Sequence, residues 1–211
     1  MIHELRTYTL HPGKLPAFLD LAANVSRPVR GDAYGKLHGY WVSEFGTLNQ
    51  VWHLWEYASL DERARLRLAL AANERWRTEY VAKVQPLMVR QDIRLLEPVR
   101  PVQPPDGAGH LYEVRIYRAN VGKARPWANL FNAIMPVRER YSRNVGIWMG
   151  EAPQPNEIVH MWAYPDLNIR AKTRAEVAAD PKWQEFLREA GGMLAEMQNT
   201  LLLPTAFSPM K

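Results

Sequence analysis

The sequence contains one unit twice, and this internal repeat restricts the possible folds more than any single motif does. A shift of 107 positions aligns residues 39–64 with residues 146–171 and gives ten identities in 26 positions, where unrelated sequences would share about two. The identical pairs are Gly39 and Gly146, Trp41 and Trp148, Glu44 and Glu151, Asn49 and Asn156, His53 and His160, Trp55 and Trp162, Tyr57 and Tyr164, Leu60 and Leu167, Arg63 and Arg170, and Ala64 and Ala171.

The repeat extends beyond this block with small changes of register. The stretch "HELRTYTLHPGK" matches "YEVRIYRANVGK", so Glu4, Arg6 and Tyr8 correspond to Glu113, Arg115 and Tyr117, and "PVR" at residues 28–30 recurs at 136–138. Between the copies lies "PVRPVQPPDGAG", whose prolines favour an extended spacer. We therefore predict two units, residues 1–98 and 110–211, joined by a proline-rich linker at residues 99–109.

Composition and charge exclude several classes of function. The absence of cysteine removes disulfides, thiolate nucleophiles and cysteine-ligated metal sites. The net charge of +5 comes with arginines mixed among carboxylates and with no recognition module, so no nucleic-acid partner is expected. No apolar run reaches membrane-spanning length and the amino terminus lacks the pattern of a signal peptide, so we expect no membrane partner and a cytoplasmic location.

Hydrophobic periodicity and turn residues predict the same order of elements in both copies. A capping box at Ser59 and Glu62 indicates a helix start, and Asn73 and the matching Asp180 indicate a helix break. In the first copy we expect a strand at 3–10, a helix that Pro28 ends or bends, strands at 39–45 and 50–57, helices up to Pro86 and a strand at 89–96. This order predicts an α+β fold, with a helix-backed antiparallel sheet of ferredoxin-like type in each unit.

Strand alternation divides the residues of each predicted sheet into two sets. One set is exchangeable and largely apolar between the copies, and we expect it to pack under the helices: Leu5, Thr7, Gln50, Trp52, Leu54 and Glu56 with their counterparts. The other set keeps Glu, Arg, Tyr, His and Trp in both copies. We expect this polar-aromatic set to face a partly wet cavity that the two units enclose together, because a buried charge must be paired.

The repeated block also resembles a known family. "GYWVSEFGTLNQVWHLWEYASLDER" closely resembles the NIPSNAP signature, and "GIWMGEAPQPNEIVHMWAYPDLNIR" is a weaker second copy with Pro153 in place of Gly46 and Met161 in place of Leu54. The resemblance implies a dimeric α+β barrel architecture, in which two ferredoxin-like units pack sheet to sheet around a pocket. One chain can supply both halves, and a homo-oligomer stays open. The changed turn predicts that the two pockets differ.

The candidate site residues come from the polar-aromatic face. His53 and His160 are candidates for accepting a proton, and Arg6 and Arg115 for stabilising an enolate or carboxylate. Candidates for ligand contact are Trp41, Trp148, Trp55, Trp162, Tyr8, Tyr117, Tyr57, Tyr164, Asn49 and Asn156. Structural alternatives stay open: the histidines can hydrogen-bond a neighbouring strand or the turn asparagine, the tryptophans can be core, and Glu4 and Glu113 can neutralise the arginines.

These residues support three functional hypotheses. The first is a small-molecule-binding barrel for an aromatic or enol-type ligand, with oxygenase or isomerase chemistry that needs no cofactor. The second is a non-catalytic interaction or scaffold protein, which expects a cavity filled by the protein's own side chains. The third, a haem-binding barrel, has only a lone imidazole per copy to act as axial ligand. No metal site is expected, because no second histidine or carboxylate stands at ligand spacing.

Overall fold

The computed structural model describes residues 1–211 and shows two units of the same architecture. In the first unit, the order strand, helix, strand, strand, helix, strand is confirmed. Its strands are β1 (Ile2–Leu10), β2 (Lys36–Phe45), β3 (Gln50–Tyr57) and β4 (Met88–Arg100). Its helices are α1 (Leu15–Leu21), α2 (Arg27–Arg30), α3 (Leu60–Ala72) and α4 (Ala82–Val84), with π-helical segments at Ala22–Ser26 and Trp76–Val81 and a 3₁₀ turn at Gln85–Leu87.

The second unit repeats this order. Its strands are β5 (Leu111–Ala119), β6 (Arg143–Ala152), β7 (Glu157–Tyr164) and β8 (Leu194–Pro204). Its helices are α5 (Ala124–Ala133), α6 (Met135–Arg138), α7 (Leu167–Ala179) and α8 (Pro181–Glu189). Residues 101–110 between the units form no helix or strand, and the backbone N–H of Gln103 donates to the carbonyl of Val145, which holds this segment against β6.

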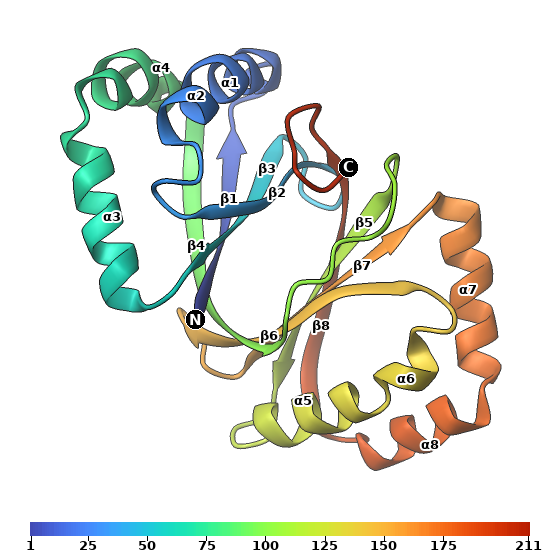
Figure 1. The fold of residues 1–211 in the computed structure, drawn as a ribbon. Helices are drawn as coiled ribbons and strands as arrows, with labels where there is room; N and C mark the ends of the chain where they lie inside the picture. The colour runs from blue at the N-terminus through green and yellow to red at the C-terminus, as the bar shows by residue number, and fades with distance from the viewer.

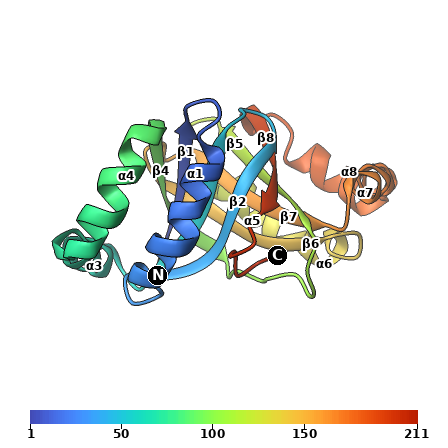
Figure 2. The ribbon, with the colours of Figure 1, turned by 90° about the horizontal axis from the view of Figure 1, so that it is seen from above.

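Eight antiparallel strands close into one barrel in the order β1-β3-β2-β8-β5-β7-β6-β4. Within each unit the first strand lies between the third and the fourth, and β2–β8 and β4–β6 pairs join the units. The barrel therefore closes within a single chain. The helices of the first unit cover one side of the barrel and those of the second unit cover the opposite side (Figures 1 and 2).

Local signals in the sequence explain where the helices begin and end. The hydroxyl of Ser59 accepts from the backbone N–H of Glu62, and Asp180 accepts from the N–H groups of Lys182 and Trp183 at the start of α8. Pro28 does not end the first helix. The helix widens into a π-helical segment just before it and continues to Arg30, after which Gly31 (φ 50°) terminates it.

The division of the strand residues into two sets was predicted correctly, but each set faces the side that was predicted for the other. The exchangeable set fills the barrel interior, where a core cluster contains Leu5, Trp52, Leu54, Val114, Val159 and Met161. The polar-aromatic set lies between the sheet and the helices of its own unit. An eight-stranded barrel is just wide enough to be filled by side chains. The apolar set therefore forms the core that both units share, and no single cavity holds both histidines.

Candidate functional site

Each unit places its repeated histidine beneath its own helices. His53 is 4% exposed and His160 is 2% exposed, and they line two separate pockets on opposite sides of the barrel. The prediction that both imidazoles and both guanidinium groups project into one shared space is therefore wrong. Alternation along the strand puts His53 and Leu54 on opposite faces of the sheet. Because Leu54 packs in the barrel interior, His53 must point outward, towards the helices.

A tryptophan two residues further along the strand fixes the tautomer of each histidine. Trp162 Nε1 lies 2.7 Å from His160 Nδ1, and Trp55 Nε1 makes the same contact with His53 Nδ1. An indole N–H can only donate, so Nδ1 accepts and the proton of the neutral imidazole resides on Nε2. Neither Nε2 atom has a hydrogen-bond partner in the protein. Each histidine thus presents a buried, unused N–H donor, and the hydrogen bond to the turn asparagine, one of the structural alternatives, is not formed.

Burial and nearby cations keep both imidazoles neutral. Burial is the main cause that holds the pKa of His160 well below its ordinary value, and the charges of Arg115, Arg138 and Arg174 lower the pKa further. Burial followed by three arginines has the same effect on the pKa of His53. With Nδ1 engaged and protonation disfavoured, the assigned role of proton acceptor does not fit the geometry.

Buried carboxylates neutralise the predicted arginines, as the structural alternative expected. Arg115 Nη1 lies 2.7 Å from Glu113 Oε1, and Arg170 of α7 makes a two-pronged contact with the same carboxylate at 2.7 and 3.0 Å. In the first unit, Glu4 binds Arg6 at 2.8 Å and also contacts Arg63 of α3. The repeated Arg63 and Arg170 therefore fasten a helix to each sheet.

The sequence analysis missed one arginine in each site. Arg138, from the repeated "PVR", is 4% exposed, and its guanidinium carbon lies 4.1 Å from the centroid of the Trp162 ring. Arg138 donates to the hydroxyls of Ser142 and Tyr164 but contacts no carboxylate. Arg30 is arranged in the same way over Trp55 and donates to Tyr57. The recurrence of "PVR" at the end of a helix was the signal that could have identified both.

The second unit has the larger pocket beside its histidine. A cavity of about 420 Å³ lies between β5, β7, β8 and helices α5 and α8. Aromatic rings form much of its wall, and the Phe131 and His160 rings are 4.7 Å apart between centroids. The cavity is lined by Arg115, Tyr117, Trp127, Phe131, Arg138, His160, Trp162, Arg174, Trp183, Phe186, Leu187, Ala190, Gly191, Gly192, Leu194 and Met197.

Larger side chains reduce the corresponding cavity of the first unit to about 210 Å³. Tyr40 stacks on His53 with ring centroids 4.7 Å apart and planes at 4°, whereas the strand register puts Ile147 in the equivalent place beside His160. Tyr80 is buried in the first cavity, while Leu187, at the matching position in the repeat, is 45% exposed. The two pockets differ, as expected, but the cause is Tyr40 and Tyr80 and not the changed turn, because Gly46 and Pro153 line neither pocket.

The remaining predicted residues divide between these pockets and other places. The pockets are lined by Trp55 and Tyr8 in the first unit and by Trp162 and Tyr117 in the second. The hydroxyls of Tyr57 and Tyr164 accept hydrogen bonds from the buried arginines. Trp41 and Trp148 instead lie in the barrel core, each ring covering the glycine two residues before it. Asn49 (φ 56°) and Asn156 are turn residues whose carbonyls accept from Leu10 and Ala119, and neither lines a histidine pocket.

A second polar cluster was also missed by sequence reasoning. His3, His38 and Glu56 come from three different strands and lie on the interior side of the barrel wall, with their ligand atoms within 4.8 Å of one another. Residues this far apart in sequence have no local spacing that would have revealed the cluster. A polar recess of about 530 Å³, lined by Thr7, Gln50 and Arg94 among others, contains none of the predicted site residues.

Comparison with known proteins agrees with this architecture. The NIPSNAP family model matches residues 3–101 and 112–209. Protein NipSnap homolog 3B of Mus musculus is 31% identical over 214 residues, covering 99% of this chain and 85% of the relative. The human Protein NipSnap homolog 3A is 30% identical over 217 residues, covering 100% of this chain and 86% of the relative.

Solved structures show the same fold at much lower identity. A monooxygenase-like protein from Lactobacillus acidophilus NCFM superposes with a TM-score of 0.70 at 12% identity, covering 96% of this chain and 92% of the other.

In the present chain, no helix combines the length and the apolar character needed to cross a bilayer. The two matched segments coincide with the two halves of the barrel, and the chain therefore belongs to the NIPSNAP family, with two NIPSNAP units in tandem.

Proposed function

We propose that the second unit binds a small planar molecule with an anionic oxygen, such as a phenolate or an enolate, in the pocket beside His160. One observation carries the proposal. The buried Nε2–H of His160 has no partner in the protein, and it lies in an aromatic pocket that three guanidinium groups also line. An unused buried donor costs free energy, and a ligand oxygen that accepts from it removes that cost.

The charges around the pocket favour an anion over a neutral ligand. Glu113 forms ion pairs with Arg115 and Arg170, which leaves Arg174 unpaired at the exposed side of the pocket. Arg138 adds a second positive charge without a carboxylate partner. A preorganised cation and a neutral N–H donor directed at the same region stabilise an oxyanion more strongly than water does.

The rings of the pocket suit a flat ligand. Trp127 and Phe131 of α5 stack with centroids 4.5 Å apart, and Trp183 and Phe186 of α8, with centroids 4.9 Å apart, line the same cavity. Such walls hold a planar molecule and keep water from its anionic oxygen. Stabilisation of the anion is the first requirement for cofactor-independent oxygenase or isomerase chemistry on an enol, and His160 contributes as a hydrogen-bond donor instead of as a base.

The alternatives fit the second unit less well. A scaffold role expects a cavity filled by the protein's own side chains, which describes the first unit, with its Tyr40 and Tyr80, better than the second. A haem axial ligand must present an imidazole lone pair to the iron, whereas the Trp162 hydrogen bond leaves a proton on the nitrogen that faces the pocket.

Titration with chromogenic phenols tests the proposal. The probes are 4-nitrophenol and nitronaphthols, whose ionised forms absorb in the visible. Added protein should increase the phenolate band at a pH below the phenol's own pKa and should quench tryptophan fluorescence in the same titration. If no phenol of the set produces either signal, the proposal is wrong.

Matched variants from the two units locate the binding. His160→Asn and Arg174→Gln should each weaken phenolate binding by about 10-fold or more, the effect expected when a charge-assisted hydrogen bond is lost. The controls His53→Asn and Arg67→Gln change the corresponding residues of the first unit and should leave the affinity unchanged. Equal losses in both units would contradict the assignment to the second pocket.

A further inference from the structure

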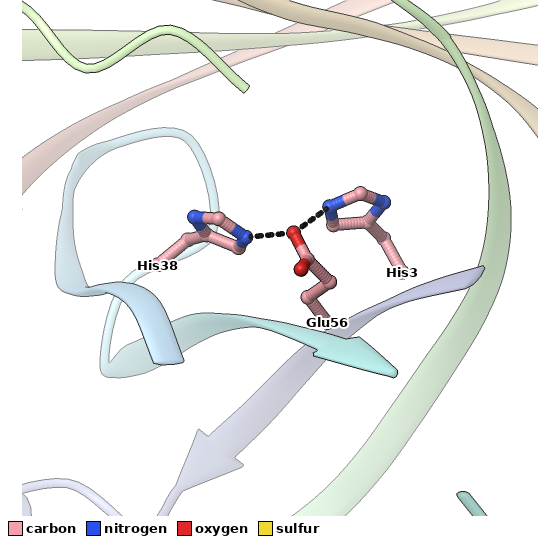
Figure 3. A group of neighbouring side chains, drawn as sticks. All are labelled: His3, His38 and Glu56. Carbon is pink, nitrogen blue, oxygen red and sulfur yellow. Dashed lines mark hydrogen bonds and ion pairs between the residues drawn. The ribbon is translucent and has the colours of Figure 1, made fainter. Parts of the chain in front are cut away.

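Two histidines and one glutamate meet on the interior side of the barrel wall, separate from both histidine pockets. His38 Nε2 lies 2.7 Å from Glu56 Oε2, and His3 Nε2 lies 3.4 Å from the same oxygen. Figure 3 shows both imidazoles directed at the carboxylate from opposite sides. Three adjacent strands, β1, β3 and β2, supply the three side chains, so the sheet itself fixes their spacing.

His3 is the unusual member of this cluster. The residue is completely buried, and neither of its ring nitrogens makes a hydrogen bond. Its neighbours are the His38 ring, at a centroid distance of 5.4 Å, and the Trp148 ring, at 5.9 Å. The only polar contact of the ring is the long one from Nε2 to Glu56, and a buried polar group without a hydrogen bond is destabilising by about 1–3 kcal/mol. Something other than packing must account for a histidine here.

The second unit shows that the fold does not require these polar residues. The strand registers place Tyr112, Val145 and Ala163 at the positions equivalent to His3, His38 and Glu56. All three of these equivalents are buried in the barrel core. The same barrel position is thus filled by Tyr, Val and Ala on one side and by His, His and Glu on the other.

The spacing of the donor atoms suits a small cation. Donors held at about 2.1 Å from one tetrahedral metal ion lie about 3.4 Å apart. The His3–Glu56 separation already has this value, while the His38–Glu56 contact would lengthen by about 0.7 Å on binding. Glu56 keeps 22% of its side chain exposed, which gives an ion and its water a path from solvent.

We propose that His3, His38 and Glu56 form a binding site for a divalent transition-metal ion of the zinc or ferrous-iron type. Two imidazole nitrogens and one carboxylate are a ligand set that such ions prefer, and three protein ligands leave at least one coordination position for water or another ligand. A metal ion would replace the long 3.4 Å contact between His3 Nε2 and Glu56 with a coordinate bond.

Metal binding requires a free lone pair on the ligating nitrogen of each neutral imidazole. In the absence of metal, His38 Nε2 donates its proton to Glu56, so this proton must move to Nδ1 or to water when an ion binds.

Titration of the tag-free chain with Co²⁺ and Zn²⁺ after chelator treatment tests the proposal. Co²⁺ should produce a visible absorption band that saturates at one ion per chain, and Zn²⁺ should displace Co²⁺ at the same stoichiometry. Bound metal should also raise the unfolding temperature. Absence of a saturable site for either ion would overturn the proposal.

Variants that copy the second unit test whether these three residues are the ligands. Glu56→Ala and His38→Val introduce residues that the equivalent positions already hold, and each should lower metal affinity by about 100-fold or more. His11→Ala removes an exposed histidine outside the cluster and should have no effect. A folded Glu56→Ala variant, checked by circular dichroism, that still binds Co²⁺ with unchanged affinity and spectrum would also refute the assignment. Glu56→Gln, nearly the same in shape, supplies the comparison if the alanine variant does not fold.

Discussion

Trp162 donates the hydrogen bond that decides what His160 can do. Its indole nitrogen lies 2.7 Å from Nδ1 of the imidazole, and both rings are at least 98% buried. The bond leaves Nε2 protonated and directed at the pocket, so the same histidine that the sequence suggests as a base is built as a donor. Trp55 and His53 form the same hydrogen bond in the first unit, so the Trp–His pair is common to both units.

The tautomer can be measured directly. In ¹⁵N-histidine-labelled protein, long-range proton–nitrogen spectra should show His160 and His53 in the Nε2–H form near neutral pH. Trp162→Phe keeps a ring beneath Arg138 but removes the donor, which leaves Nδ1 without a partner. We expect a mixture of tautomers at His160 and a loss of about 1–3 kcal/mol in unfolding free energy. An Nδ1–H form in the unmodified protein would contradict the assignment.

The Glu113 carboxylate should be essential for stability. It is fully buried and binds both Arg115 and Arg170, so Glu113→Gln leaves two guanidinium groups without their counter-charge. The expected loss is about 3–5 kcal/mol in unfolding free energy, measured by urea denaturation at pH 7. Arg118→Gln breaks the exposed pair with Glu196 and serves as control, with an expected change below about 1 kcal/mol. Similar losses in both variants would show that burial of the ion pair is not the cause.

Acid should destabilise the fold well before its carboxylates titrate. Burial holds the pKa values of His53 and His160 far below 6.5, so below that pH the unfolded chain binds protons that the folded protein does not. Above pH 6.5 neither state binds these protons, and as the pH falls below 6.5 the folded protein loses stability at a rate that approaches about 1.4 kcal/mol per pH unit for each histidine. Denaturation curves between pH 7 and 5 should steepen towards this limit, and the double variant His53→Gln, His160→Gln should remove up to about 2.8 kcal/mol per unit of the slope. An unchanged slope would mean that other groups take up the protons.

Much of the fold follows from the sequence because its signals are local. The capping residues Ser59 and Asp180, the strand alternation through His53 and the offset between His53 and His160 each involve short stretches of chain. Alternation specifies which side chains share a face of the sheet, and this division is confirmed. Which face points inward depends on how the sheet closes, and alternation carries no information on that.

The site is less predictable because it forms between distant segments. Arg138 reaches Trp162 from the end of a helix, and His3 meets Glu56 only through strand pairing. The sequence did contain one usable signal. An arginine of a predicted helix, Arg63 or Arg170, and a glutamate of the first strand are both present in each copy. Pairing of the two indicates that the polar face of the sheet lies under the helices. Where charged side chains of helix and strand are both repeated, we expect them to pair.

Arg138 separates the demands of stability from those of ligand binding. Its guanidinium is buried against Trp162 with hydroxyl partners only, and burial lowers its pKa, which is the sign of a charge that the folded protein holds at a cost. Arg138→Met fills the same volume without the charge, so unfolding free energy should stay within about 1 kcal/mol of the original or increase. Phenolate binding should weaken by about 10-fold or more, because the pocket loses a cation that faces the ligand. The matched change Arg30→Met in the first unit should have a comparable effect on stability and none on phenolate affinity. If Arg138→Met unfolds the protein while Arg30→Met does not, Arg138 is required for the fold of the second unit. Its positive charge in the pocket would then be no evidence for an anionic ligand.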